Sequence, residues 1–87
     1  MAYRVEVKPQ AEKALAKIAN PYRRRIAKEI DQLANEPRPP SCVKLAGADT
    51  AYRIRVGDYR IVYEIVDRVL VVYVVRVAHR KDVYRGL

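Results

Sequence analysis

The chain has 87 residues, of which 51% are hydrophobic, and it carries a formal net charge of +8. This length fits one small domain over residues 1–87, and the apolar content excludes a disordered basic tail. The charge favours a polyanionic partner, which can be nucleic acid, an anionic membrane or an acidic protein.

Two rare residue types and the hydropathy pattern narrow the class of protein further. Cys42 is the single cysteine and His79 the single histidine, so the sequence predicts neither an internal disulfide nor a metal site. No stretch approaches the roughly 18 apolar residues of a membrane span, and the first residues lack the apolar region of a signal peptide. We therefore expect a cytoplasmic protein that does not contact a membrane.

The first half of the chain predicts one strand followed by two helices. Residues 3–7 alternate apolar and charged side chains, which is typical of a strand with one buried face. Residues 10–19, after Pro9, and residues 21–35, from Pro21, place apolar residues at helical spacing. A loop rich in proline and small residues follows over residues 36–51 and includes Lys44.

Three consecutive arginines, Arg23 to Arg25, lie in the first turn of the second predicted helix. Cations there oppose the positive end of the helix dipole, at about 0.3–1 kcal/mol each, so they are not present for helix stability. They form either a solvated basic face or a contact for phosphate or for an acidic partner.

Residues 52–65 predict a β-hairpin around the two-residue turn Gly57-Asp58. This turn pairs Tyr52 with Tyr63, Ile54 with Ile61 and Val56 with Tyr59 on one face. On the other face it sets Arg55 opposite Arg60, with Arg53 two residues along. Like charges so placed destabilise a sheet by about 0.2–1 kcal/mol per pair. The arginines are therefore either an anion-binding surface or a solvated face whose long side chains splay apart.

Residues 69–78 are a β-branched run that predicts a central strand. A three-residue turn over residues 67–69 would keep the odd-numbered valines on the core face and set Arg76 opposite Arg60. A two-residue turn, or a bulge, would instead move His79 to the arginine side and Arg76 off it. In the polar ending that follows, Tyr84 either stacks on a nucleotide base or folds back over the sheet.

The element order predicts an α+β fold, β-α-α-β-β-β, with two N-terminal helices packed on a mainly antiparallel four-stranded sheet. With this order, the segments KLAG, YRIRVGDYRIVYEI and VVYVVRVAHRKDVYR resemble the RelE family of toxin–antitoxin toxins over essentially the whole chain. The resemblance implies a ribosome-dependent endoribonuclease that cuts mRNA in the A site, contacts rRNA and is silenced by an acidic cognate antitoxin. It also implies a reaction without metal or cofactor, in which a ribose 2′-hydroxyl attacks the adjacent phosphate.

The resemblance assigns the site to basic residues around the hairpin, with the terminal tyrosine, namely Arg53, Arg55, Arg60, Arg80 and Tyr84. Fixed guanidinium groups suit this reaction because negative charge builds up on the phosphate. The best-known family member has lysines at the two positions before the turn, and arginine effectively cannot give up a proton. His79 is the expected substitute as base or acid. Further contacts to RNA are expected from Lys44, Arg76 and Lys81.

Two other functions fit parts of the sequence. A ParE-like toxin of the same superfamily would inhibit DNA gyrase by binding, without catalysis. A non-catalytic nucleic-acid-binding module would need only the basic face. The ending H-R-x-x-V-Y at residues 79–84 favours the nuclease over both.

Overall fold

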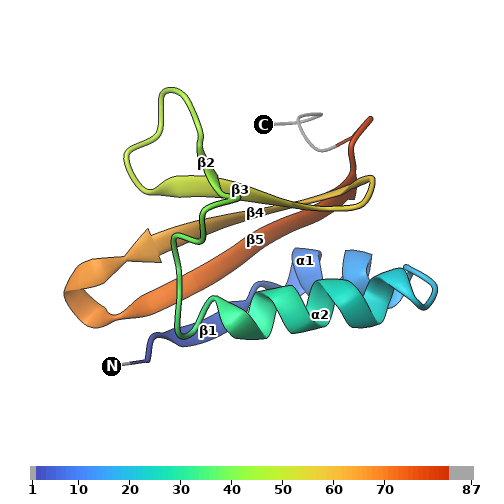
Figure 1. Ribbon diagram of the computed structural model, residues 1–87, viewed down its shortest axis with the longest axis horizontal. Coiled ribbons are helices and arrows are strands. Elements are labelled where there is room, and N and C mark those ends of the chain that lie inside the picture. The colour runs from blue at the N-terminus through green and yellow to red at the C-terminus, as the bar shows by residue number, and fades with distance from the viewer. Residues whose placement is uncertain (1, 83–87) are drawn as a thin grey trace.

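A computed structural model of the chain describes residues 2–82 and shows two helices against one face of a sheet (Figure 1). The helices are α1 (Pro9–Ala16) and α2 (Tyr22–Gln32). The strands are β1 (Arg4–Val7), β2 (Val43–Lys44), β3 (Ala51–Val56), β4 (Tyr59–Val66) and β5 (Val71–His79), with a short 3₁₀ turn at Asp67–Val69. The predicted α+β class and element order are confirmed.

The sheet differs from the expectation in its number of strands. It has five strands in the order β1-β5-β4-β3-β2, because the two residues of β2 pair with Tyr52 and Arg53 at one edge. The strand β1 lies parallel to β5, and the other neighbouring pairs are antiparallel. β2 was missed because it is two residues long inside a proline-rich loop, where alternation cannot be recognised.

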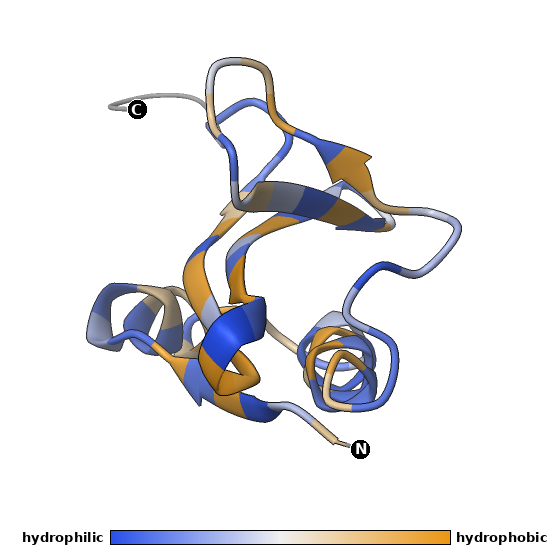
Figure 2. Ribbon diagram, turned by 90° about the vertical axis from the view of Figure 1, so that its left-hand side faces the viewer, coloured by the Kyte–Doolittle hydropathy of each residue, from blue (hydrophilic) through white to orange (hydrophobic). Residues whose placement is uncertain are grey.

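The core lies between the helices and the sheet. Figure 2 shows both helices under the same face, with hydrophobic segments turned toward the space between the layers. From α2 and the turn after it, Ile26, Ile30 and Leu33 are buried at 0%, 4% and 1% exposure, at the helical spacing that the sequence predicts. They pack against strand residues such as Ile61 and Tyr63. Burying a side chain of this size stabilises the fold by about 1.5–3 kcal/mol.

The hairpin between β3 and β4 has the predicted register. Val56 pairs with Tyr59, Arg55 with Arg60, and the remaining predicted pairs also form. Gly57 has φ of 59°, in the region that favours glycine, which explains its position in the turn.

The register of β5 differs from the prediction. Its turn has four residues between Val66 and Val71, so Val72 and Val74 are on the core face. A bulge then lies between the pairs Tyr63–Val74 and Val62–Arg76. The prediction that the odd-numbered residues of β5 face the core is therefore wrong for the first half of the strand and right for Val77.

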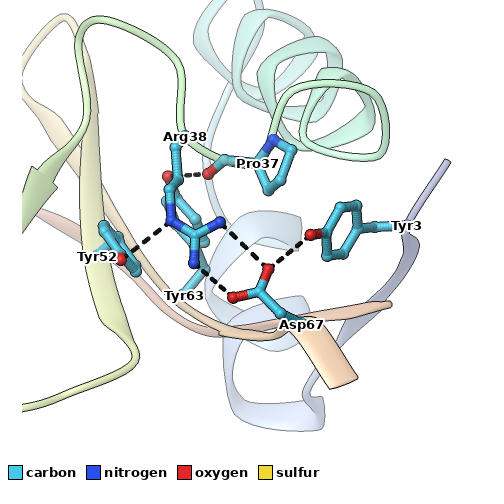
Figure 3. A network of polar contacts seen from close by, with 6 residues as sticks. All are labelled: Tyr3, Pro37, Arg38, Tyr52, Tyr63 and Asp67. Atoms are coloured by element: carbon cyan, nitrogen blue, oxygen red, sulfur yellow. Dashed lines mark hydrogen bonds and ion pairs between the residues drawn. The ribbon is translucent and has the colours of Figure 1, made fainter. Parts of the chain in front are cut away.

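A polar network at the end of the sheet away from the hairpin ties three segments together (Figure 3). Arg38, in the loop after α2, donates to both carboxylate oxygens of Asp67 at 2.7 and 3.2 Å, and the Tyr3 hydroxyl donates to the same group at 2.6 Å. The hydrogen bond from Arg38, followed by that from Tyr3, lowers the pKa of Asp67. Nearby, the buried Tyr63 hydroxyl donates to the carbonyl of Pro37 at 2.8 Å. The network fixes the loop that leads into β2.

Neither helix among residues 2–82 has the length and apolarity that crossing a bilayer requires.

Candidate nucleic-acid interface

The face of the sheet that the helices leave uncovered carries a cluster of arginines, which we call the arginine face and define as Arg53, Arg55, Arg60 and Arg76. The register arranges them in two rows that run across β3, β4 and β5. One row is Arg55, Arg60 and Ala78, and the other is Arg53, Val62 and Arg76. Arg55 and Arg60 are therefore direct neighbours, while Val62 separates the other two arginines.

Arg76 lies on the predicted face of the sheet, but its partner on β4 differs from the predicted one. The four-residue turn alone would have turned it to the core face, and the bulge before it restores its side of the sheet. Its partner on β4 is Val62, and Arg60 instead pairs with Ala78. The predicted straight line through Arg55, Arg60 and Arg76 is therefore wrong.

The hairpin tip brings Arg60 and Arg80 to the same end of the sheet. Nη1 of Arg60 donates to the carbonyl oxygens of Gly57 and Tyr59, at 3.4 and 3.3 Å, so its side chain follows the turn. The backbone N–H of Arg80 donates to the carbonyl of Asp58 at 2.7 Å, and its Nε lies 4.0 Å from the Asp58 carboxylate. Asp58, predicted only as a turn residue, thus fixes the segment after β5 against the hairpin.

Arg76 also holds the segment that follows β5. Its Nη2 donates to the carbonyl oxygen of Asp82 at 2.6 Å, and its Nε is buried without a hydrogen-bond partner among residues 2–82. A second bond joins the N–H of Asp82 to the carbonyl of His79 at 2.8 Å. Arg76 therefore holds the turn that carries Arg80, in addition to its charge on the open face.

His79 lies on the other side of the sheet from the arginines. It pairs with Tyr59, and the two rings meet edge to face with centroids 5.7 Å apart. Its Nδ1 accepts a hydrogen bond from the N–H of Lys81 at 3.3 Å. The structure thus places His79 next to Arg80 in the chain but does not bring its ring to the arginine face.

Of the remaining predicted residues, Lys44 and Lys81 lie toward opposite ends of the sheet. Lys44 pairs with Tyr52, which places it on the helix side of the edge strand, and Lys81 is exposed after β5. Tyr84, predicted to stack on a base, lies outside the described residues, so its role stays a prediction.

An apolar hollow of about 520 Å³ beside the arginine face was not predicted. The loop between β2 and β3 projects from the sheet on the side away from the helices (Figure 1), and residues of this loop line the hollow. Val62, which lies between two arginines, contributes to the floor and is 3% exposed. The small apolar residues of this loop were the sequence feature that could have indicated the hollow. The full lining is Leu45, Ala46, Ala48, Ala51, Val62, Glu64 and Val75.

The chemistry available here is the binding and stabilisation of negative charge. A unit anion 4 Å from one guanidinium gains about 1 kcal/mol in bulk water and about 4 kcal/mol at the effective dielectric near a protein surface. Guanidinium groups also donate in a fork that fits two phosphate oxygens. Within residues 2–82 no group of three or more His, Cys, Asp or Glu side chains is arranged to hold a metal ion.

Comparison with protein families gives a match over nearly the whole chain. The family model described as "ParE toxin of type II toxin-antitoxin system, parDE" matches residues 5–84. A RelE-like toxin protein of Escherichia coli is 33% identical over 88 residues, which cover 97% of this chain and 92% of the relative. The mRNA interferase toxin RelE of Escherichia coli K12 is 30% identical over 83 residues, covering 93% and 86% respectively.

Solved structures agree with these matches. The archaeal RelE–RelB complex from Pyrococcus horikoshii contains a chain with a TM-score of 0.82 and 33% identity, with 92% of this chain and 97% of that chain covered. The intact Escherichia coli RelBE toxin–antitoxin complex contains one with a TM-score of 0.79 and 29% identity, with 90% and 96% covered. The fold of the chain is thus similar to that of chains solved together with an antitoxin.

Proposed function

The chain belongs to the ParE/RelE family of type II toxin–antitoxin toxins, and we propose that it is an endoribonuclease that cleaves mRNA in the ribosomal A site. The observation that carries this proposal is the arginine face, in which Arg55 lies opposite Arg60 and Arg80 is tied to the same hairpin tip. Opposed like charges cost a sheet about 0.2–1 kcal/mol per pair, so an anionic ligand is their best explanation. Similarity to proteins named mRNA interferase supports the choice of RNA.

The proposed reaction is an in-line transfer within the RNA. The 2′-oxygen attacks the adjacent phosphorus, the bond from phosphorus to the 5′-oxygen breaks, and the products are a 2′,3′-cyclic phosphate and a 5′-hydroxyl. Arg55, Arg60 and Arg80 stabilise the extra negative charge on the five-coordinate phosphorus. These cations supply the role that a metal ion plays in other nucleases, so we propose a metal-independent reaction.

Proton transfer needs a group other than arginine. The 2′-hydroxyl must lose a proton, and the leaving 5′-oxygen must gain one. His79 has suitable chemistry, but its ring rests on Tyr59 across the sheet from the arginines. The geometry therefore supports the arginines directly, whereas the assignment of His79 rests on its chemistry and on its place next to Arg80. Tyr84 is proposed as the group that stacks on a neighbouring base.

A cognate antitoxin is the second proposed partner. Relatives are solved as RelE–RelB complexes, and a chain with a net charge of +8 favours an acidic partner. We propose that this partner is partly disordered alone and folds on binding, since such segments can wrap large surfaces.

The decisive experiment maps the 5′ ends of message in cells that express the toxin. Arg60→Ala and Arg80→Ala should reduce cleavage within codons by about 10- to 100-fold, because one charge-assisted hydrogen bond is worth about 1.5–3 kcal/mol. Arg68→Ala is the matched control, since it removes the same charge from the exposed turn at the other end of β4. Folded Arg60→Ala and Arg80→Ala proteins that cut as well as the control would refute the site.

The ParE branch supplies the alternative function, because the matching family model carries that description. A ParE-like toxin would inhibit DNA gyrase without cutting RNA. Growth arrest with intact message and damaged DNA would establish this alternative. Message cut within codons, with 5′-hydroxyl ends, would exclude it.

A further inference from the structure

A second basic surface lies on the helix side of the hairpin tip, where a crevice of about 310 Å³ separates α2 from the end of β3. Figure 1 shows α2 running below this end of the sheet. The crevice shares no residue with the apolar hollow and only Arg55 with the arginine face. Its lining residues are Arg25, Lys28, Glu29, Gln32, Arg55, Val56 and Gly57.

Three basic residues from two elements line this crevice. Arg25 and Lys28 are one turn apart on α2, and Arg55 comes from β3. The lining also contains one carboxylate, that of Glu29. Three basic residues and one acid give the lining a net charge of +2. None of the three cations forms an ion pair with a residue of the described chain. The crevice thus has uncompensated positive charge at the protein surface.

The shape of the crevice is fixed by the contact of the hairpin tip with α2. A Cβ atom on Gly57 would lie 2.6 Å from Cε1 of Tyr22, so the turn rests directly on that ring. Tyr22 in turn packs against Tyr59, with ring centroids 5.6 Å apart, and the Arg25 guanidinium lies 5.3 Å from the Tyr22 ring centre. These contacts hold the walls of the crevice together without a ligand.

Arg55 connects the crevice to the arginine face. It lies opposite Arg60 on the open side and also lines the crevice on the helix side. The edge strand β2 pairs only with Tyr52 and Arg53, so within residues 2–82 no strand covers the outer edge of β3 from Ile54 to Val56. A bound chain can therefore pass from the arginine face around this edge.

We propose that the crevice binds a backbone phosphate of the RNA strand, outside the position of cleavage. The identity of the ligand as RNA rests on the proposed function, and the site itself rests on the geometry above. Continuity through Arg55 favours a polymer with regularly spaced phosphates over a separate acidic peptide. The crevice then orients the strand and lengthens its footprint, and it takes no part in the chemistry.

The test measures binding of the full chain to fluorescently labelled RNA by anisotropy over a range of salt concentrations. The RNA carries 2′-deoxyribose throughout its central positions so that it cannot be cut, and it is used as a dinucleotide and as a nonanucleotide. Arg25→Ala/Lys28→Ala is compared with Arg23→Ala/Arg24→Ala, which removes the same charge from the same helix. The control residues line a different hollow, between α1 and α2.

Loss of one phosphate contact lowers the slope of log affinity against log salt by about 0.7 for a single strand. We expect this change, with an affinity loss of about tenfold at low salt, for the nonanucleotide and the Arg25→Ala/Lys28→Ala protein. The dinucleotide and the control protein should show neither. A variant with Gln at both positions, which keeps a polar side chain with part of the aliphatic stem but no charge, should reproduce the loss, and urea unfolding confirms that each variant is folded.

Equal salt slopes for the two double variants, or no RNA binding by the unmodified chain, would overturn the site. A variant that keeps its affinity for RNA but loses affinity for hexaglutamate would assign the crevice to an acidic peptide and overturn the proposal as well. Mapping of cleaved message separates this result from the proposed function. If message is cleaved but the salt slopes of the two double variants are equal, only the proposed phosphate site in the crevice is refuted. If the slopes differ as expected but no message is cleaved, only the proposed nuclease function is refuted.

Discussion

Substitution of Gly57 by alanine tests how the hairpin tip is held in place. Gly57 has φ of 59°, and an alanine there costs about 1–2 kcal/mol because its Cβ crowds the following carbonyl. The new Cβ would also lie 2.6 Å from the Tyr22 ring, which must move away from Tyr59. An aromatic pair of this kind contributes about 0.5–1.5 kcal/mol. The two costs together predict a loss of about 1.5–3.5 kcal/mol in the free energy of unfolding.

Gly47→Ala is the matched control for this substitution. Gly47 has φ of 78°, but a Cβ there would meet nothing within 4 Å. It should therefore lose only the backbone cost of about 1–2 kcal/mol. The difference between the two variants isolates the collision with Tyr22.

Thermal unfolding followed by circular dichroism measures both variants. For a domain of this size, 1 kcal/mol shifts the midpoint by about 4–8 °C, so Gly57→Ala should unfold about 6–28 °C below the unmodified protein. In a Tyr22→Ala background the excess over Gly47→Ala should vanish, as a double-mutant cycle requires for a direct contact. If Gly57→Ala costs no more than Gly47→Ala in the unmodified background, the tip does not rest on Tyr22.

Three further predictions concern single side chains. Tyr63→Phe leaves the Pro37 carbonyl without its partner and should cost about 1–3 kcal/mol in urea unfolding; an unchanged midpoint would show that the bond contributes nothing. Because Arg38 lowers the pKa of Asp67 in the folded state, the stability from this carboxylate is present above its ordinary value of 3.8 and is lost as pH falls toward the folded value. Asp67→Asn should therefore lose less stability than the unmodified protein between about pH 5 and pH 2, and parallel curves would contradict this. If His79 is the base, the cleavage rate on programmed ribosomes should fall with falling pH, and His79→Ala should lack this limb; an identical profile would remove His79 from the mechanism.

The sequence was most informative where side chains alternate clearly in character. Around the hairpin, charged and apolar residues alternate with a period of two, and a two-residue turn leaves one register, so the pairing of Arg55 with Arg60 could be predicted. In α2 and the turn after it, the spacing of Ile26, Ile30 and Leu33 likewise predicts the buried side of the helix.

Less could be predicted where both faces of an element are apolar. Val71, Val72 and Val74 are all buried, so hydrophobicity does not choose between the two faces of β5. The bulge that follows has no signal in a run of valines. The hydrogen bond from Arg76 to the carbonyl of Asp82, and the crevice below Arg55, depend on how distant segments pack, which local patterns do not report.

The bulge in β5 also sets how positive charge is distributed. With a three-residue turn and no bulge, Arg76 would stand directly beside Arg60 and three arginines would fill one row across the sheet. The four-residue turn and the bulge each add one residue, and together they move Arg76 two positions along, about 7 Å at the rise of a strand, into the row of Arg53. The positive electrostatic potential of this surface therefore extends along the strands and is not concentrated in one row. Such a field attracts an extended polyanion along several of its charges, while a small free anion meets only part of it.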